Sequence, residues 1–466
     1  MKTILHFWVI FFLLFICRFS FGQKQFVFGD SLANEKGIVS HQLPDGSIWV
    51  IGSGARANEL NMDVIAVKID TGGTVLSNFN RYGTVDLEYP NNMIYQGGKF
   101  IIVGEQHSST GVDGFVLVID TQGVQESFQT YGLPNQSEQF FDIKPTMDGG
   151  FVVSGFSSVG PGNDFLIGKF DSTYQLEWLR SHDLGTNDIG VTVIENPSGG
   201  FLIAGDQPQP LGNYNVVVMA VDNLGNALWD KFISNPFNGG CKTMIKMGDD
   251  LLIVGEMSTN TSSSFDIYLV KIDWQGNIKW QKTVPKTNSG DACFDAYLNN
   301  PNEVILTGYA YSTATNSTDM FVMAVDSSGN VLSEEYFHYG QFEMGYDVKP
   351  NRYGGFIMTG FAKNVNTGAD EFFVTLSNIG TMTAVETTNR RLLKSKIYPN
   401  PTKDQVFIPK SLVKFELKVY DINGKEKKVV VNNNQVSLNS FSSGIYLFLF
   451  SDGSGNTRYT QKLVVE

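Results

Sequence analysis

The sequence is poor in the residues and motifs on which most catalytic centres depend. It has five histidines in 466 residues, of which one lies in an N-terminal apolar segment and the others are His41, His107, His182 and His338. It contains no His-Glu-x-x-His, no Gly-x-Ser-x-Gly and no phosphate-binding loop. Sequence motifs therefore give no support to a zinc protease, a serine hydrolase or a nucleotide-hydrolysing enzyme.

Long apolar runs are also scarce, and the only one lies at the N-terminus. Residues 1–22 have Lys2 near the start and an apolar core from Ile4 to Cys17. This pattern predicts a secretory signal peptide, because the run is too short and wrongly flanked for a spanning helix. A lipoprotein anchor on Cys17 is the alternative, which the bulky Ile16 disfavours. No other stretch reaches spanning length, so we expect no transmembrane segment.

Charge is sparse and unevenly distributed. Only 17% of the residues are charged, and the formal net charge is −13. Residues 391–466 carry 12 Lys or Arg against 6 Asp or Glu, whereas residues 23–390 hold a net charge of −21. An acidic body disfavours nucleic acid and anionic membranes as partners. It is compatible with calcium, cationic partners or neutral glycans.

A repeat of 50 to 53 residues occupies most of the chain. Each copy has a first apolar run that ends in a glycine, here called the landmark glycine: Gly52, Gly104, Gly155, Gly205, Gly255, Gly308 and Gly360. A second apolar run ends at an aspartate in six copies, here called the blade aspartate: Asp70, Asp120, Asp171, Asp222, Asp273 and Asp326. Periods of this size indicate a solenoid or a propeller.

The pattern within one period favours the propeller. The apolar runs are short, rich in β-branched and aromatic residues and bounded by Gly, Asn and Asp, which is typical of buried strands. Turns such as Asp222-Asn223-Leu224-Gly225 have hairpin chemistry, with a calcium loop as the rival interpretation. Four strands in each of seven copies predict an all-β, seven-bladed β-propeller over residues 23–385. We expect residues near Phe26 to complete the seventh blade and close the ring.

Two cysteines remain after the signal peptide, Cys241 and Cys293. They lie 14 and 15 residues before their landmark glycines, so we expect their side chains on opposite sides of neighbouring inner strands. Two buried thiols are the favoured interpretation, and a disulfide is the alternative.

The C-terminal region has a different pattern. Residues 386–396 have no strand pattern and are interpreted as a linker, and residues 397–466 contain short alternating strands that suit a small, Ig-like β-sandwich. Its motifs include Tyr398-Pro399-Asn400-Pro401, a turn ending at Gly424, and Ser443-Gly444-Ile445-Tyr446. These motifs resemble the type A C-terminal sorting domain of type IX secretion cargo in Bacteroidota.

That resemblance implies passage through the outer membrane by the type IX machinery as a partner, usually with removal of the domain and release or attachment to surface lipopolysaccharide. The protein is then secreted or surface-attached. The repeat itself resembles the unassigned propeller repeats common in such cargo, which implies architecture and no activity.

One set of polar residues recurs 16 or 17 residues before the landmark glycines and is here called the acidic ring: Glu35, Glu88, Glu138, Asp188, Asn238, Asp291 and Glu343. The chain there returns from an outer strand to the next inner strand, so we expect the ring near the rim of the central channel. Carboxylates from several blades could bind a hard cation such as calcium. The favoured alternative is that each carboxylate accepts hydrogen bonds from its own turn or the adjacent blade.

Two further features are candidates for binding. Trp178, Trp229 and Trp280 follow the blade aspartates by seven residues in adjacent copies, either as an exposed stacking stripe or, as we favour, buried between blades. Polar segments that differ between copies, among them residues 56–61, 107–110, 207–214 and 259–264, should emerge together on one end of the propeller.

The sequence therefore predicts an exported propeller that acts as a binding module for a glycan or protein ligand, without a cofactor apart from the calcium considered above, and as a monomer. An enzyme that acts on polysaccharide through rim carboxylates is the alternative from another class, since glycosidases need only two carboxyl groups about 5 to 10 Å apart. A structural or adhesion component of the cell surface is the third.

Overall fold

A computed structural model provides the structure of this chain. It describes residues 24–29, 34–55, 61–77, 79–159, 162–185, 187–208, 214–233, 239–258, 265–284, 290–312, 317–340, 342–364, 367–377, 397, 402–408, 412–413, 415–421, 425–432, 434–439, 441–451 and 457–465. The predicted signal peptide and linker lie outside these residues. The chain divides into two compact units, residues 1–385 and 386–466. Across the described part, we find no helix long and apolar enough to cross a membrane.

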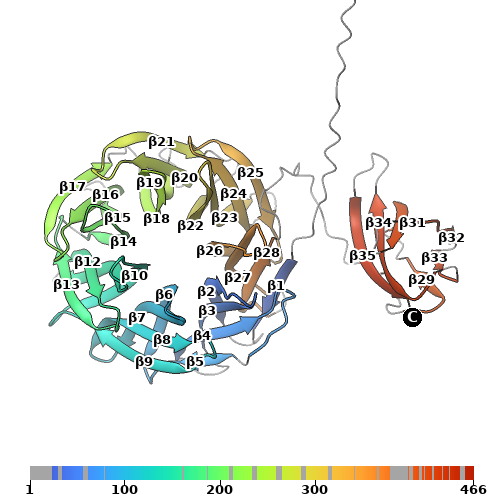
Figure 1. Ribbon diagram of the computed structural model, residues 1–466, viewed down its shortest axis with the longest axis horizontal. Coiled ribbons are helices and arrows are strands. Elements are labelled where there is room, and N and C mark those ends of the chain that lie inside the picture. The colour runs from blue at the N-terminus through green and yellow to red at the C-terminus, as the bar shows by residue number, and fades with distance from the viewer. Residues whose placement is uncertain are drawn as a thin grey trace, which may run out of the picture. The chain divides into compact units, whose positions relative to one another are not determined.

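The first unit is a seven-bladed β-propeller, as predicted (Figure 1). Each blade is a four-stranded antiparallel sheet, and the first strand of each lies nearest the central channel. Blades 1 to 3 consist of β2 (Glu35–Gln42), β3 (Ile48–Ala55), β4 (Met62–Ile69) and β5 (Asn80–Tyr82); β6 (Leu87–Gln96), β7 (Lys99–Ser108), β8 (Gly111–Asp120) and β9 (Gln125–Tyr131); and β10 (Ser137–Pro145), β11 (Phe151–Val159), β12 (Gly162–Phe170) and β13 (Leu176–His182).

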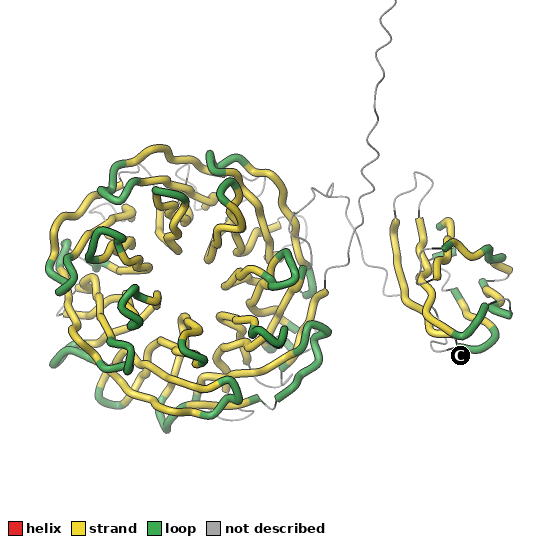
Figure 2. The backbone as a smooth tube through the Cα atoms, in the orientation of Figure 1, coloured by secondary structure: helices red, strands yellow, loops and turns green. Residues whose placement is uncertain are grey.

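Blades 4 to 6 repeat this order around the ring (Figure 2). They consist of β14 (Ile189–Glu195), β15 (Phe201–Pro208), β16 (Tyr214–Val221) and β17 (Ala227–Ile233); β18 (Gly239–Met247), β19 (Asp250–Ser258), β20 (Phe265–Ile272) and β21 (Ile278–Val284); and β22 (Asp291–Asn300), β23 (Glu303–Ser312), β24 (Ser317–Asp326) and β25 (Val331–Phe337).

Blade 7 is assembled from both ends of the unit. It takes β26 (Glu343–Pro350), β27 (Phe356–Lys363) and β28 (Asp370–Leu376) from the end of the repeat and β1 (Lys24–Phe28) from its beginning. β1 pairs antiparallel with β28, from Lys24 opposite Leu376 to Phe28 opposite Phe372. The predicted closure near Phe26 is confirmed, and it covers a strand edge that would otherwise be unpaired.

The turns at the blade aspartates form because one carboxylate organises the backbone. In blade 4, Oδ1 of Asp222 accepts the N–H groups of Leu224 at 2.9 Å and Asn226 at 2.8 Å. Gly225 has a φ of 79°, a conformation that L-residues with side chains rarely adopt. The same bonds recur at Asp70, Asp120, Asp171, Asp273 and Asp326. At these turns Oδ1 binds backbone N–H groups, as the predicted hairpins require.

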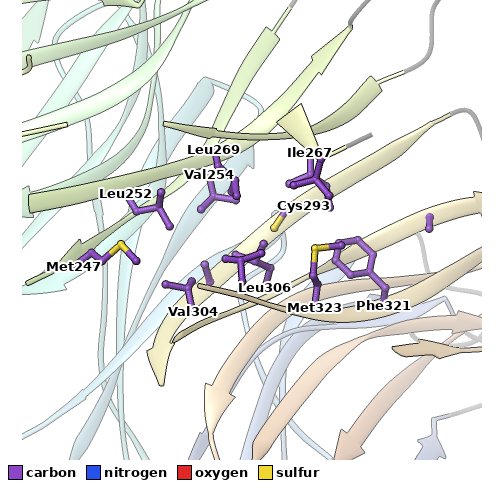
Figure 3. Close-up of a cluster of buried hydrophobic side chains, with 14 residues drawn as sticks. Met247, Leu252, Val254, Ile267, Leu269, Cys293, Val304, Leu306, Phe321 and Met323 are labelled. Atoms are coloured by element: carbon purple, nitrogen blue, oxygen red, sulfur yellow. The ribbon is translucent and has the colours of Figure 1, made fainter. Parts of the chain in front are cut away.

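The core of the propeller lies between neighbouring blades. The cluster in Figure 3 joins Leu252, Val254 and Leu269 of blade 5 to Leu306 and Phe321 of blade 6. Each of these five side chains has 1% or less of its surface exposed. This packing explains why the strands are apolar on both faces, since each blade is covered on both sides by another blade.

Cys241 and Cys293 are both buried and free, so the disulfide alternative is wrong. The expectation that they point to opposite sides is also wrong, because both occupy the same register position, opposite Gly255 and Gly308. The extra residue after Cys293 is absorbed by a second irregularity in β22, between Leu298 and Asn300. Burial raises the pKa of both thiols.

The second unit contains two small antiparallel sheets around one apolar core. The strands are β29 (Gln405–Phe407), β30 (Glu416–Asp421), β31 (Glu426–Lys427), β32 (Val431–Asn432), β33 (Gln435–Ser437), β34 (Gly444–Ser451) and β35 (Thr457–Val465). One sheet has the order β29-β33-β32 and the other β31-β30-β34-β35. Val406, Val419 and Phe448 are fully buried between them.

Candidate functional site

The central channel of the propeller contains a cavity of about 360 Å³. Inner strands of all seven blades contribute to its wall: β2, β6, β10, β14, β18, β22 and β26. These strands surround the centre of the ring in Figure 1. A cavity of this volume falls within the range typical of small-ligand sites.

A β-bulge in every inner strand brings one side chain into this cavity. The pairing register of each inner strand slips by one residue opposite the landmark glycine, for example between Phe140 and Asp142 opposite Gly155. The extra residues are here called the bulge residues: Ile38, Asn91, Phe141, Val191, Lys242, Phe294 and Tyr346. All seven line the cavity. Bulges often re-aim a side chain toward a functional site.

The landmark glycines are explained by the same bulges. A Cβ on Gly155 would lie 1.7 Å from the carbonyl oxygen of Gln139, in the bulged strand. At the other six landmark glycines the corresponding distance is 1.8 or 1.9 Å. No side chain fits at these positions, so the bulge requires a glycine there. From the sequence alone, these glycines serve only to locate the repeats.

One side of the cavity is aromatic. The rings of Phe294 and Tyr346, two neighbouring bulge residues, have centroids 5.2 Å apart. Tyr309 lies 5.8 Å from Phe294, and Phe361 lies 5.8 Å from Tyr346. Phe294 and Tyr346 line the cavity, and Tyr309 and Phe361 pack against them. Such faces bind apolar or flat ligand surfaces at a low cost in conformational entropy.

Polar groups accompany the bulge residues elsewhere around the channel. Nδ2 of Asn91 donates to Oε2 of Glu105 at 2.5 Å, and Nζ of Lys242 lies 3.0 Å from Oε1 of Glu256. Burial raises the pKa of Glu105 to about 7, although Asn91 opposes the shift. Burial would lower the pKa of Lys242, but Glu256 outweighs it and the pKa rises. The cavity therefore combines aromatic faces with hydrogen-bonding groups.

The residues that follow the bulges tie neighbouring blades together. Asp142 accepts hydrogen bonds from Asn92 of blade 2 and Thr192 of blade 4, both at 2.7 Å. Asp347 accepts the N–H of Ser40 in blade 1 at 3.0 Å, and burial raises the pKa of Asp347 to about 6. Nζ of Lys349 lies 2.8 Å from Asp295 in blade 6. These contacts hold the inner strands in a closed ring.

The predicted acidic ring lies at blade junctions. Glu35, Glu88, Glu138, Asp188, Asp291 and Glu343 are all buried, at or next to the first residue of an inner strand. Asn238 lies outside the described residues. None of the six is among the residues that line the cavity. The ring therefore lies at the seams between blades, away from the cavity wall.

Turns and adjacent strands supply some of the contacts of this ring. Oε1 of Glu88 accepts hydrogen bonds from the hydroxyl of Thr84 at 2.7 Å and from Nε2 of Gln106 at 2.8 Å. Nη2 of Arg81 lies 2.9 Å from Oε1 of Glu35. Such bonds are of the kind expected if the carboxylates fix their own turns.

A second acidic position faces the ring, and sequence reasoning missed it. A Cβ on Gly132 would lie 2.3 Å from Oδ1 of Asp113 and 2.7 Å from Oε2 of Glu138, so the two carboxylates meet across this glycine. Burial raises the pKa of Glu138 to about 7, and Asp113 adds to the shift. The missed signal was a constant spacing, seven residues before the blade aspartates: Asp63, Asp113, Asp164, Asn215, Asp266 and Asp319.

The tryptophans lie between blades, as favoured. Trp178 is 9% exposed, and its Nε1 donates to the carbonyl of Asn223 in the next blade at 3.2 Å. A Cβ on the turn glycine of the next blade would lie 2.6 Å from Trp178, 2.8 Å from Trp229 and 2.9 Å from Trp280. Each indole therefore packs against the neighbouring turn, and an exposed stacking stripe is wrong for Trp178.

The variable segments are only partly described. Residues 56–60, 209–213 and 259–264 lie outside the described residues, so their predicted convergence on one end stays a prediction. His107 contacts Tyr89, with ring centroids 5.3 Å apart.

Of the sorting motif, Tyr398, Pro399, Asn400, Pro401 and Gly424 also lie outside the described residues. Gly444 begins β34, and Tyr446 is 3% exposed in the core of the second unit. The hydroxyl of Tyr446 donates to the carbonyl of Ser442 at 2.9 Å, and its ring packs edge-on against Phe441. The motif residues that are described therefore stabilise the turn before β34.

Comparison with protein families identifies this second unit. Residues 396–466 match the secretion system C-terminal sorting domain. The resemblance to type IX secretion cargo is thus confirmed, and the protein is exported to the cell surface or the extracellular space. Comparison with curated proteins gives no significant match.

Several solved structures resemble the chain at low identity. A catalytically inactive virginiamycin B lyase from Staphylococcus aureus is 10% identical, with 76% of this chain and 99% of that chain covered and a TM-score of 0.49. PorZ from Porphyromonas gingivalis, a surface component of the type IX secretion system, is 12% identical, with 90% and 68% covered and a TM-score of 0.36. The propeller of the Trilobed protease from Pyrococcus furiosus is 11% identical, with 74% and 93% covered and a TM-score of 0.44.

Proposed function

We propose that this exported propeller is a binding protein whose central cavity takes the end of a neutral saccharide. The observation that carries the proposal is that all seven inner strands bulge at the same position, and the seven bulge residues include aliphatic, aromatic, amide and cationic side chains. A uniform frame with a varied lining is the arrangement expected of a recognition site on a repeat scaffold.

The lining suits a saccharide because it offers both aromatic rings and hydrogen-bonding groups. Phe294 and Tyr346 present rings to the apolar faces of a sugar. Lys242 supplies a hydrogen-bond donor for its hydroxyl groups, and Oδ1 of Asn91 supplies an acceptor. The net charge of −21 on residues 23–390 favours a neutral ligand over an acidic one.

The test is a glycan array followed by calorimetry on the tag-free, full-length protein. We expect one saccharide per chain, with at least tenfold weaker binding in Tyr346→Ala and Phe294→Ala. Tyr353→Ala is the matched control, because Tyr353 is 57% exposed and is not among the cavity residues.

The outcomes separate the three function classes. Equal affinity in the cavity variants and the control would contradict the proposal. Cleavage of a bound polysaccharide would favour the enzyme alternative, and loss of that cleavage in Glu138→Gln would assign it to the acidic ring. Failure to bind any saccharide, with an intact fold, would favour a structural role at the cell surface.

A further inference from the structure

Three side chains with metal-binding atoms converge at the junction between blades 6 and 7. Asp319 belongs to β24, His338 follows β25 directly, and Glu343 is the first residue of β26. Nδ1 of His338 lies 2.8 Å from Oδ1 of Asp319 and 3.7 Å from Oε2 of Glu343. The three ligand atoms all lie within 4.8 Å of one another.

Glu343 adds an unpaired buried oxygen, which Glu88 and Glu138 also have, but only that of Glu343 faces an imidazole in the described part of the propeller. Its side chain is fully buried, and Oε1 accepts the N–H of Gly340. Oε2 is buried as well, yet it accepts no hydrogen bond from any described residue and is directed toward His338. An oxygen in this situation costs free energy, because it has lost water and gained no partner. A cation between the three side chains would remove that cost.

The other described junctions lack a nitrogen ligand at this place. Residues equivalent to His338 in the repeat are Gly83, Gly132 and Asp183 at three junctions, and Gly29 at the junction that closes the ring. At the closing junction, Arg81 compensates Glu35. Only at the junction of blades 6 and 7 does an imidazole meet the paired carboxylates in the described part of the propeller.

We propose that Asp319, His338 and Glu343 bind one divalent transition-metal ion, with Zn²⁺ as the preferred class. Zinc takes imidazole and carboxylate ligands at about 2.0 to 2.2 Å, so neighbouring ligand atoms in a tetrahedral site lie about 3.3 Å apart. The two separations from Nδ1, 2.8 and 3.7 Å, fall on either side of that value. Calcium prefers six to eight oxygen ligands, which a site with an imidazole does not supply.

The site is open on one side. The side chains of His338 and Asp319 are 54% and 20% exposed, whereas that of Glu343 is fully buried. An ion can therefore enter from solvent, and water can fill the remaining coordination position. Binding requires a neutral imidazole, because the metal takes the place of the proton that His338 and Asp319 share at Nδ1.

The experiment titrates the tag-free, full-length protein with ZnCl₂ by calorimetry and with CoCl₂ by visible absorption. We expect one ion per chain, a visible Co²⁺ band, and a thermal midpoint several degrees higher with zinc. His338→Ala and Glu343→Gln should weaken zinc binding at least tenfold and abolish the band. Both variants are expected to fold. His338 is largely exposed, and Glu343→Gln removes a buried charge.

Two matched controls make the result specific. Glu138→Gln changes the equivalent carboxylate at a junction with glycine in place of histidine, and His182→Ala removes a histidine whose Nε2 faces the carbonyl of Gly225. Both should bind zinc as the wild type does. Absence of binding, equal loss in either control, or a Glu343-dependent response to CaCl₂ alone would overturn the proposal. Saccharide binding in the cavity should be unchanged in His338→Ala, so this proposal and the proposed function fail separately.

Discussion

The outer turns and the bulges both recur around the propeller, but the turns repeat a side chain and the bulges repeat a backbone conformation. At the turns of blades 1 to 6 the side chain is the same, an aspartate whose Oδ1 accepts two backbone N–H groups, as at Asp222. At the bulges the backbone is the same, whereas the side chains range from aliphatic and aromatic to amide and cationic. A residue that the backbone needs cannot vary, whereas a residue that the backbone merely positions is free to serve recognition.

The largest effect on stability should come from a landmark glycine, because it contacts the backbone of the bulged strand. Gly155→Val would place a side chain 1.7 Å from the carbonyl of Gln139 and force the bulge to open. We expect a loss of about 3 kcal/mol or more, measured as a lower midpoint in urea or heat. Gly162→Ala is the control, since its Cβ would meet nothing nearer than 3.7 Å. A stable Gly155→Val variant would show that the bulge is not a rigid part of the frame.

The junction carboxylates should make stability depend on pH. The pKa of Glu138 is raised from 4.5 to about 7 in the folded chain, so the folded state keeps a proton that the unfolded state has released between these values. Stability should therefore fall as the pH rises from about 4.5 to 7. The side chain in Glu138→Gln cannot ionise. This variant should therefore lose up to about 2 kcal/mol less stability than the wild type over this pH range, measured by melts at several pH values.

Asp113→Asn sharpens this test. It removes the neighbouring carboxylate, so it should lower the pKa of Glu138 and move the slope toward lower pH. An unchanged pH profile in both variants would mean that this junction does not hold the extra proton.

A turn aspartate should have a smaller effect, because its bonds lie at the surface. Asp326→Ala removes the acceptor of the N–H groups of Ser328 and Asn330. We expect the thermal midpoint to fall by roughly 2 °C. Asn330→Ala removes only a side-chain bond to Asp326 and should lower it less. The reverse order would mean that the aspartate is not the organising residue.

Exchange of a bulge residue should have the smallest effect on the fold. Ile38→Asn gives blade 1 the side chain that blade 2 has at Asn91, on the same bulged backbone. We expect a change in stability below about 1 kcal/mol and a clear change in ligand preference on the array. A loss as large as that of Gly155→Val would remove the distinction between frame and lining.

Sequence reasoning was most successful where the signal was periodic. The repeat predicted seven blades, the turn type and the closing strand β1, because each depends on local pattern and on an unpaired edge that must be covered. It failed where a one-residue irregularity mattered. Cys241 and Cys293 occupy equivalent positions only because β22 absorbs an extra residue, which counting along the chain cannot detect.

The architecture and the export route can be predicted from the chain alone, since both follow from repeated or contiguous residues. The side chains that line the cavity, and those that meet at the junctions, become visible only in the folded chain. The bulge turns one residue of each inner strand into the channel, and Asp319, His338 and Glu343 come together from the end of one blade and the start of the next. Such contacts depend on how the blades pack, because neither blade holds the complete set.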